Sequence, residues 1–404
     1  MSSSIPLKSE DARRRVSPVL IVALAQLFGT SLWFSANAAA DDLKRAWGIG
    51  ATEIGWLTSA VQLGFITGTL TLALGGLADR FKASRLFVVS AILGALFNLA
   101  FAYLSTGLLT AIMLRYCVGI CLAGIYPVGM KLVVSWAPQQ RGAALSLLVA
   151  MLTLGTALPQ ALHLASRALP WTAVMTAASV LAFLAAALIS WLGDGPYLSA
   201  PSRNQEVQTS ILRVFKLRAF RAGTFGYFGH MWELYAFWAL VPALIAQTHL
   251  ADRLGVSAPS LIAFVIIGIG ALGCIGGGMA SRLLDSARVA AISLLTSGLC
   301  CVVFALTAGK LDAMWLFALL LVWGATVIAD SPQFSAISSQ ACPPELVGGA
   351  LAIQNAIGFA MTVVSISLTA PLVSSWGVHV AWLLVPGPIL GLLGMRPLLK
   401  APVA

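Results

Sequence analysis

Long apolar runs separated by short polar breaks extend along nearly the whole chain of 404 residues. A helix needs about 20 apolar residues to cross the ~30 Å hydrocarbon core of a bilayer, whereas the strands of a membrane barrel alternate polar and apolar residues over about ten positions. The runs therefore predict an all-α, polytopic membrane protein with twelve transmembrane helices. The expected spans are 18–40, 52–77, 85–105, 108–135, 142–165, 170–192, 219–246, 258–281, 287–308, 312–338, 346–372 and 376–396.

Composition excludes the main soluble classes of protein. Hydrophobic residues make up 59% of the chain and charged residues only 9%, against about 25% charged residues in a soluble domain. This balance is unsuited to a cytosolic enzyme or a nucleic-acid-binding protein. The chain also lacks a Gly-x-x-x-x-Gly-Lys-Ser/Thr phosphate-binding loop. We therefore expect a protein that is not an enzyme, with no cofactor and no metal.

The distribution of positive charge predicts the orientation of the chain. Five of the 24 Lys and Arg lie in the expected outer segments, two lie within a span, and the others lie in the expected inner segments when both termini are cytoplasmic. The first apolar run follows 13–15, three arginines, as a cleavable signal would, but it is longer than the 7–15 residues of a signal core. We expect a retained first span and, from the short loops, a bacterial inner (cytoplasmic) membrane protein.

The chain divides into two halves that resemble each other. A polar cytoplasmic linker at 193–218 separates an N-terminal bundle at 18–192 from a C-terminal bundle at 219–396. Short cytoplasmic tails at 1–17 and 397–404 complete the expected division. The Gly-Gly-x-Ala-x-Arg segment after the second span recurs after the eighth span, about half a chain later. Duplicated bundles around a midplane site are typical of alternating-access carriers.

The loop after the second span resembles the signature loop of the major facilitator superfamily. That pattern, Gly-x-x-x-Asp-Arg-x-Gly-x-Arg/Lys-Arg/Lys, is matched by Gly75, Asp79, Arg80 and Arg85, while Lys82 replaces the second glycine. The segments 115–119 (Arg-x-x-x-Gly) and 141–142 (Arg-Gly) are similar to further patterns of the family. The resemblance implies two pseudo-symmetric six-helix bundles, with the first, fourth, seventh and tenth spans around a central cavity.

The signature loop has two interpretations. In the first, Gly75, Asp79, Arg80, Arg85 and Arg141 form a conformational latch, in which Asp79 accepts hydrogen bonds at a neighbouring helix N-terminus, where the helix dipole favours an anion. In the second, the basic residues only set the orientation of the chain. The glycines and the repeat favour the latch.

Five ionisable residues lie within spans that the resemblance assigns to the cavity. They are Arg115, Lys131, His230, Glu233 and Asp330. Each such residue costs about 2.5–3.5 kcal/mol on insertion and therefore needs a partner or a function. For Arg115, the resemblance implies a part in proton transfer or helix locking.

Glu233 is the deepest of these residues, and His230 precedes it by one helical turn among several aromatic residues. Burial disfavours a charged carboxylate, and histidine changes its charge near neutral pH, so the pair is a candidate proton-coupling element. In that case Glu233→Gln abolishes pH-driven transport. A fixed structural pair is the alternative, and metal binding is disfavoured because no other ligand cluster accompanies the two residues.

Proline breaks mark two of the same spans. Pro332 follows Asp330 and frees a backbone carbonyl, and Pro127 is its repeat partner in the fourth span. Lys131, one turn further on, is expected to meet a substrate anion, to pair with Asp330, or to extend to the membrane interface.

These observations predict a secondary transporter for a small organic solute, anionic or zwitterionic, that works by alternating access coupled to protons. The alternatives are a multidrug antiporter for lipophilic cations and a membrane sensor that does not transport.

The expected partners are the small-molecule substrate, protons and membrane lipid, with no nucleic acid, and the protein is expected to be a monomer. Proton coupling is assigned to Glu233, Asp330, His230 and Arg115. The expected cavity residues are Trp33, Asn37, Tyr126, Lys131, Tyr227, His230, Trp232, Glu233, Tyr235, Asp330 and Gln333.

Overall fold

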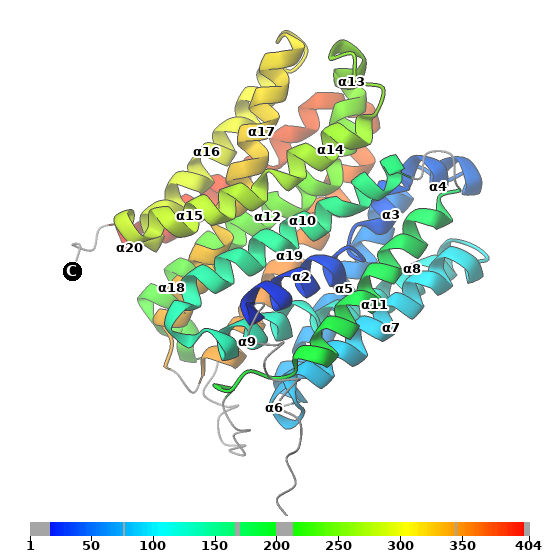
Figure 1. Cartoon of the computed structure of the whole chain (residues 1–404). Helices are drawn as coiled ribbons and strands as arrows, with labels where there is room; N and C mark the ends of the chain where they lie inside the picture. Colours follow the sequence, from blue (N-terminus) through cyan, green and yellow to red (C-terminus); the bar gives the residue numbers. More distant parts are fainter. Residues whose placement is uncertain (1–16, 76, 166–169, 199–212, 344–345, 400–404) are drawn as a thin grey trace, which may run out of the picture.

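A computed structural model describes residues 17–75, 77–165, 170–198, 213–343 and 346–399, and every regular element in these residues is a helix (Figure 1). The N-terminal half comprises α2 (Pro18–Thr30), α3 (Ser35–Ala38), α4 (Ala40–Trp47), α5 (Ala51–Leu74), α6 (Leu77–Arg80), α7 (Ala83–Leu104), α8 (Leu108–Ala123), α9 (Tyr126–Trp136), η1 (Pro138–Gln140), α10 (Arg141–Ala165) and α11 (Thr172–Leu192). The C-terminal half comprises α12 (Arg218–Gln247), α13 (Leu250–Arg253), α14 (Pro259–Gly268), α15 (Gly270–Leu284), α16 (Ser286–Thr307), α17 (Ala313–Ala329), α18 (Ser331–Gln340), α19 (Val347–Trp376), η3 (Gly377–Leu383) and α20 (Pro386–Leu399).

The fold class predicted from the sequence is confirmed. Within the described residues, nine helical segments are long and apolar enough to cross a membrane, and the last of them, Gly349–Leu399, contains both α19 and α20. The apolar helix α2 is shorter, and α12, with its buried polar residues, is not among the nine. The protein is thus an all-helical, polytopic membrane protein, and the number of twelve crossings stays a prediction.

The first, fourth, eighth and tenth expected spans are each divided into two α-helical segments. The first span changes direction between α2 and α3, at residues 31–34. Pro127 lies in the first turn of α9 and Pro332 in the first turn of α18, so both repeat-related prolines begin a second segment. A proline is tolerated there because the first-turn N–H has no partner within the helix. Side chains bind carbonyls at two of these breaks: Arg115 donates to those of Leu32 and Trp33, and Cys274 Sγ donates to that of Ile328.

The two halves contact each other mainly through α5 and α10 of the first half. α5 lies along α19, and α10 lies along α14 and α15. We name the two ends of the bundle after helices seen in Figure 1: α4 and α13 are at the α13 end, and α6 and α9 are at the α6 end. The first half of the chain thus meets the second through α5 and α10, and any space between the halves lies between these contacts.

Within the N-terminal half, α5 and α8 approach each other closely through glycines. A Cβ atom on Gly64 would overlap the Tyr116 carbonyl oxygen, and one on Gly119 would overlap the Val61 carbonyl oxygen. In a membrane, where apolar burial does not drive helix association, such close backbone packing supplies much of the attraction.

We therefore expect Gly119→Leu to destabilise the protein by roughly 1–3 kcal/mol, because the new side chain must push α5 away from α8. Gly276→Leu is the matched control, since Gly276 is also helical and has no atom near the position of a Cβ. Thermal unfolding of both variants in the same detergent measures the difference. Equal unfolding temperatures would contradict the role assigned to this contact.

Candidate functional site

A cleft of about 670 Å³ opens between the halves at the α13 end. Its volume lies in the range of small-molecule sites, about 300–1,000 Å³. Helices α3, α4, α5 and α10 form one wall, and α12, α13, α14 and α19 form the other. Polar and charged side chains line both walls. They are Asn37, Asp41, Lys44, Thr58, Gln160, His163, Gln247, His249, Asp252, Ser260, Thr369 and Ser374.

Asn37 is the predicted cavity residue that lines this cleft. The break in the first span turns Asn37 toward α5, where its Nδ2 donates a hydrogen bond of 2.8 Å to Thr58 Oγ1. Sequence reasoning missed the charged lining, which includes Lys44 and Asp252, because these residues fall in the short helices α4 and α13 outside the expected spans. One signal was available: α4 and α13 are charged segments that follow the first span of each half.

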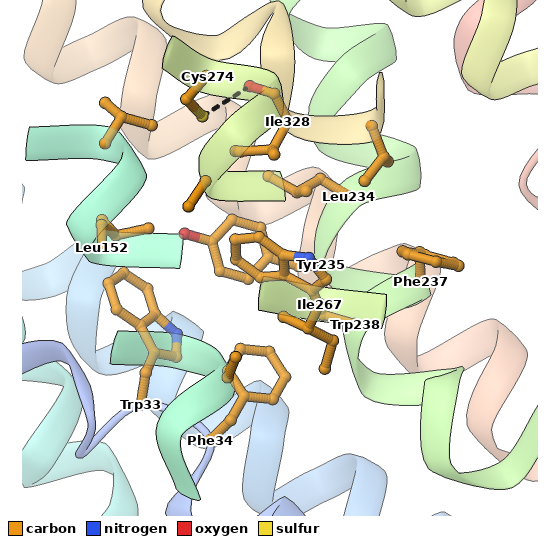
Figure 2. Packing of buried hydrophobic residues seen from close by; sticks show 14 of the residues in the cluster. Trp33, Phe34, Leu152, Leu234, Tyr235, Phe237, Trp238, Ile267, Cys274 and Ile328 are labelled. Carbon is orange, nitrogen blue, oxygen red and sulfur yellow. Dashed lines mark hydrogen bonds between the residues drawn. The ribbon is translucent and has the colours of Figure 1, made fainter. Parts of the chain in front are cut away.

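An aromatic layer lies beneath the cleft. We define it as Trp33, Phe34, Phe65, Tyr126, Tyr235, Trp238 and Phe359. The rings come from both halves, and the Trp33 ring centroid lies 5.0 Å from Phe65, 5.5 Å from Tyr235 and 5.6 Å from Phe359. Figure 2 shows Trp33 and Phe34 beside Tyr235 and Trp238 of α12. Because all seven rings are buried, the layer closes the base of the cleft.

One polar bond fixes the centre of the layer. Trp33 Nε1 donates to Gln62 Oε1 of α5 at 3.1 Å, and both side chains are fully buried. Trp33 lies one turn before Asn37, and Tyr235 lies one turn before Ala239, which lines the cleft. The predicted cavity residues Trp33, Tyr126 and Tyr235 therefore contribute to the layer between the halves.

His230 and Asp330 are brought together on the far side of this layer. His230 Nδ1 lies 2.8 Å from Asp330 Oδ1, and each side chain is 1% exposed. Asp330 occupies the break between α17 and α18, and the rings of Tyr227 and Phe334 lie about 6 Å from the imidazole. His230 Nε2 and Asp330 Oδ2 have no hydrogen-bond partner among the described residues. The pair is thus an apolar, buried ion-pair site with unused hydrogen-bonding capacity.

Glu233 points in a different direction from His230. Its Oε1 accepts hydrogen bonds from Trp323 Nε1 at 2.7 Å and from Cys301 Sγ at 3.1 Å, and its Oε2 accepts one from Ser297 Oγ at 2.8 Å. The side chain is fully buried between α12, α16 and α17, away from the residues that line the cleft. No basic side chain pairs with it in the described part of the chain. The two neighbouring residues of the sequence prediction therefore belong to separate clusters.

Arg115 binds the break in the first span. Its Nη2 donates to the carbonyl oxygens of Leu32 and Trp33 at 3.0 and 2.6 Å, and its Nη1 donates to Asn98 Oδ1 and Ser35 Oγ at 3.0 and 3.2 Å. These carbonyls are the ones that the α2–α3 break releases from helical bonding. A cation there is also favoured by the C-terminal end of the α2 dipole. The geometry supports helix locking, the second of the two roles that the resemblance implied.

The other predicted cavity residues lie outside the cleft. Tyr227 and Gln333 are buried in the C-terminal half, and Lys131 is half-buried on α9. Trp232 Nε1 donates to the Leu383 carbonyl oxygen of η3 at 2.8 Å, so this ring holds α12 against the last helices of its own half.

The latch stays a prediction. The side chain of Asp79 lies outside the described residues, and Arg80, Arg85 and Arg141 are exposed, with no ion pair to a described side chain. The anion that the structure places at the N-terminus of α7 is Asp194, whose Oδ1 accepts from the Ser84 N–H at 2.7 Å. Gly75 ends α5, in helical conformation.

Residues 20–396 match the sequence profile of the Major Facilitator Superfamily. The chain belongs to this superfamily. Two relatives are similar over part of their length. The 3-(3-hydroxy-phenyl)propionate transporter of Escherichia coli (strain K12) is 30% identical over 197 residues, which are 48% of this chain and 47% of the relative. The probable galactarate/D-glucarate transporter GudP of Pseudomonas putida is 28% identical over 114 residues, 27% of this chain and 25% of the relative. The matches thus span half or less of these relatives.

This match confirms the resemblance to the major facilitator superfamily that the loop after the second span indicated. The superfamily and both named relatives are transporters, so the expectation that the protein is not an enzyme is confirmed as well. Together with the apolar helices, the match identifies a multi-pass membrane protein of a transporter family.

We expect Arg115→Met to lower the stability of the protein by about 3 kcal/mol or more, since hydrogen bonds to a charged group contribute roughly 1.5–3 kcal/mol each. The variant removes the four that Arg115 donates. Thermal unfolding in detergent measures this loss. Arg85→Met, which removes an exposed cation of α7, is the control. If both variants unfold at the same temperature, Arg115 does not hold the break.

Proposed function

We propose that the protein is a secondary transporter that moves a small organic anion across the membrane by alternating access coupled to protons. The observation that carries this proposal is the cleft between the two halves, closed at its base by rings from both. A solute bound in the cleft can pass only when the halves tilt apart at the aromatic layer. Such tilting about a midplane site is how duplicated bundles transport.

The substrate class follows from the cleft and from the relatives. Lys44, His163 and His249 are basic groups in the cleft walls, beside the carboxylates of Asp41 and Asp252. The apolar rings beneath them suit the carbon skeleton of an organic solute. Hydroxyphenylpropionate and the sugar diacids named for the two relatives are all carboxylates at neutral pH. An organic carboxylate is therefore the substrate that we propose.

For proton coupling, we assign the principal role to His230 and Asp330. Along α12, Tyr235 of the aromatic layer lies between His230 and Ala239, the first residue of α12 to line the cleft. The pair is therefore shielded from the cleft while the layer is closed, and opening of the layer on either side changes its access to water. A carboxylate beside a histidine is a pair that can bind and release a proton.

A lipophilic-cation antiporter is the second candidate function, because Asp41 and Asp252 together with aromatic rings also suit a cation. A sensor without transport is the third. The proposed setting is a monomer in a bacterial inner membrane, with both termini cytoplasmic.

Uptake into proteoliposomes tests the function. Labelled 3-(3-hydroxyphenyl)propionate and D-glucarate are offered with and without a pH gradient, and tetraphenylphosphonium is added as a competitor. Uptake of either acid that a pH gradient accelerates supports the proposal. Flux of the cation in place of both acids supports the antiporter, and the absence of any flux supports the sensor.

We expect Asp330→Asn and His230→Gln each to reduce uptake driven by the pH gradient by at least tenfold, because neither variant retains the titratable pair. Exchange of labelled for unlabelled acid at equal pH on both sides is expected to persist. Asp312→Asn, at an exposed carboxylate that precedes α17, serves as the control. Unchanged pH-driven uptake in both pair variants would contradict the assignment.

A further inference from the structure

We propose that Glu233 is a positioning residue, which holds His230 against Asp330 through a hydrogen bond to Trp323. This inference rests on the proposed role of the His230–Asp330 pair in proton coupling. It assigns to Glu233 a function other than carrying the transported proton, and the two interpretations predict opposite results for Glu233→Gln.

The first step is that two contacts connect the same pair of helical segments. Glu233 of α12 accepts from Trp323 of α17 at 2.7 Å, and His230 of α12 lies 2.8 Å from Asp330, directly after α17. Glu233 is one turn beyond His230, and Trp323 is about two turns before Asp330. The chain runs in opposite directions along α12 and α17. Glu233, which follows His230, and Trp323, which precedes Asp330, therefore both lie nearer to the α13 end than the His230–Asp330 pair does. Trp323 lies one turn further from the pair than Glu233 does, and its long indole side chain spans this extra distance.

The second step is that the Glu233 contact is the firmer of the two. Three donors from α16 and α17 surround the carboxylate, and the Trp323 ring packs 4.4 Å from Phe237 of α12 and 5.7 Å from Phe304 of α16. His230 and Asp330 are joined by one contact between side chains; His230 Nε2 has no partner among the described residues, and the other groups that meet the Asp330 carboxylate are the backbone N–H groups of Asp330 and Ser331. The Glu233–Trp323 hydrogen bond therefore fixes how far α12 is shifted along α17. This position of the helices determines the distance between His230 and Asp330.

The third step is that this contact does not require a charged carboxylate. Ser297 Oγ lies 2.8 Å from Glu233 Oε2 and 3.1 Å from the Leu294 carbonyl oxygen. When Glu233 is protonated, its O–H donates to Ser297 Oγ and the serine hydroxyl donates to Leu294. A glutamine preserves the same arrangement, because its amide N–H₂ donates to the serine and its oxygen still accepts from Trp323. Cys301 is the one titratable side chain that hydrogen-bonds to Glu233 among the described residues.

The test follows the carboxyl band of Asp330 directly. Purified protein is titrated with acid and base while infrared absorption records its protonated carboxyl groups, and the Asp330 band is identified by its loss in Asp330→Asn. We expect Glu233→Leu and Trp323→Phe to shift the pH midpoint of that band by about one pH unit or more, since the distance to His230 changes. We expect Glu233→Gln, which keeps the hydrogen bonds and removes only the repulsion between the two carboxylates, to shift the midpoint much less than these variants do. We also expect it to keep pH-driven uptake within about twofold of the parent protein.

Two further variants complete the design. Trp315→Phe, at a mostly exposed tryptophan on the same helix, is the matched control for Trp323→Phe. Trp323→Phe retains an aromatic ring against Phe237 and loses only the N–H donor, so it is expected to fold, which thermal unfolding verifies. The double variant Glu233→Leu with Trp323→Phe is expected to match the single variants, because both remove one interaction.

Two results would overturn the inference. One is an Asp330 band that titrates in Glu233→Leu and Trp323→Phe as it does in the parent protein. The other is a loss of pH-driven uptake in Glu233→Gln with the Asp330 band unmoved, since Glu233 would then carry the proton. Failure of the proposed function has a different signature, namely pH-driven uptake that survives Asp330→Asn and His230→Gln.

Discussion

The absence of water from the interior of a membrane bundle governs this structure. Every buried polar group must find its partner within the protein, because lipid offers none. In each half, one buried charged residue is surrounded by neutral partners from several helices, and the second half also buries the His230–Asp330 pair. Arg115 donates to groups on α3, α7 and the break after α2, and Glu233 accepts from α16 and α17. Each network joins several helices of one half.

Between these two bodies, the contacts have a different character. Aromatic rings from both halves meet at Trp33, Tyr235 and Phe359, and the polar bond to Trp33 comes from its own half. Ring contacts are short-ranged and non-directional compared with a network of hydrogen bonds around an ion. The strongest directional interactions thus lie within the halves and the weaker ones between them. This difference is what a molecule needs if its halves tilt while each keeps its internal packing.

The sequence predicted the fold class, the family and the proline breaks, because apolar run length and proline chemistry act locally. It also singled out Arg115, His230, Glu233 and Asp330, since the energetic cost of each in a span is visible without a structure. The sequence did not predict how these groups pair. Helical periodicity places His230 and Glu233 near one face, yet an offset of one turn is enough to direct them to different neighbours, Asp330 and Trp323. The charged walls of the cleft were missed for another reason: α4 and α13 are short helices in connecting segments, which apolar run length does not detect.

The aromatic layer has an electrical consequence. A hydrated ion that entered the cleft would meet a closely packed set of rings with no free cation or anion among them, and stripping its water there costs far more than thermal energy. The layer is therefore a barrier to ions between the cleft and the far side of the bundle. In the proposed transport cycle, such a layer would keep ions from leaking through the protein while a vestibule is open to one side.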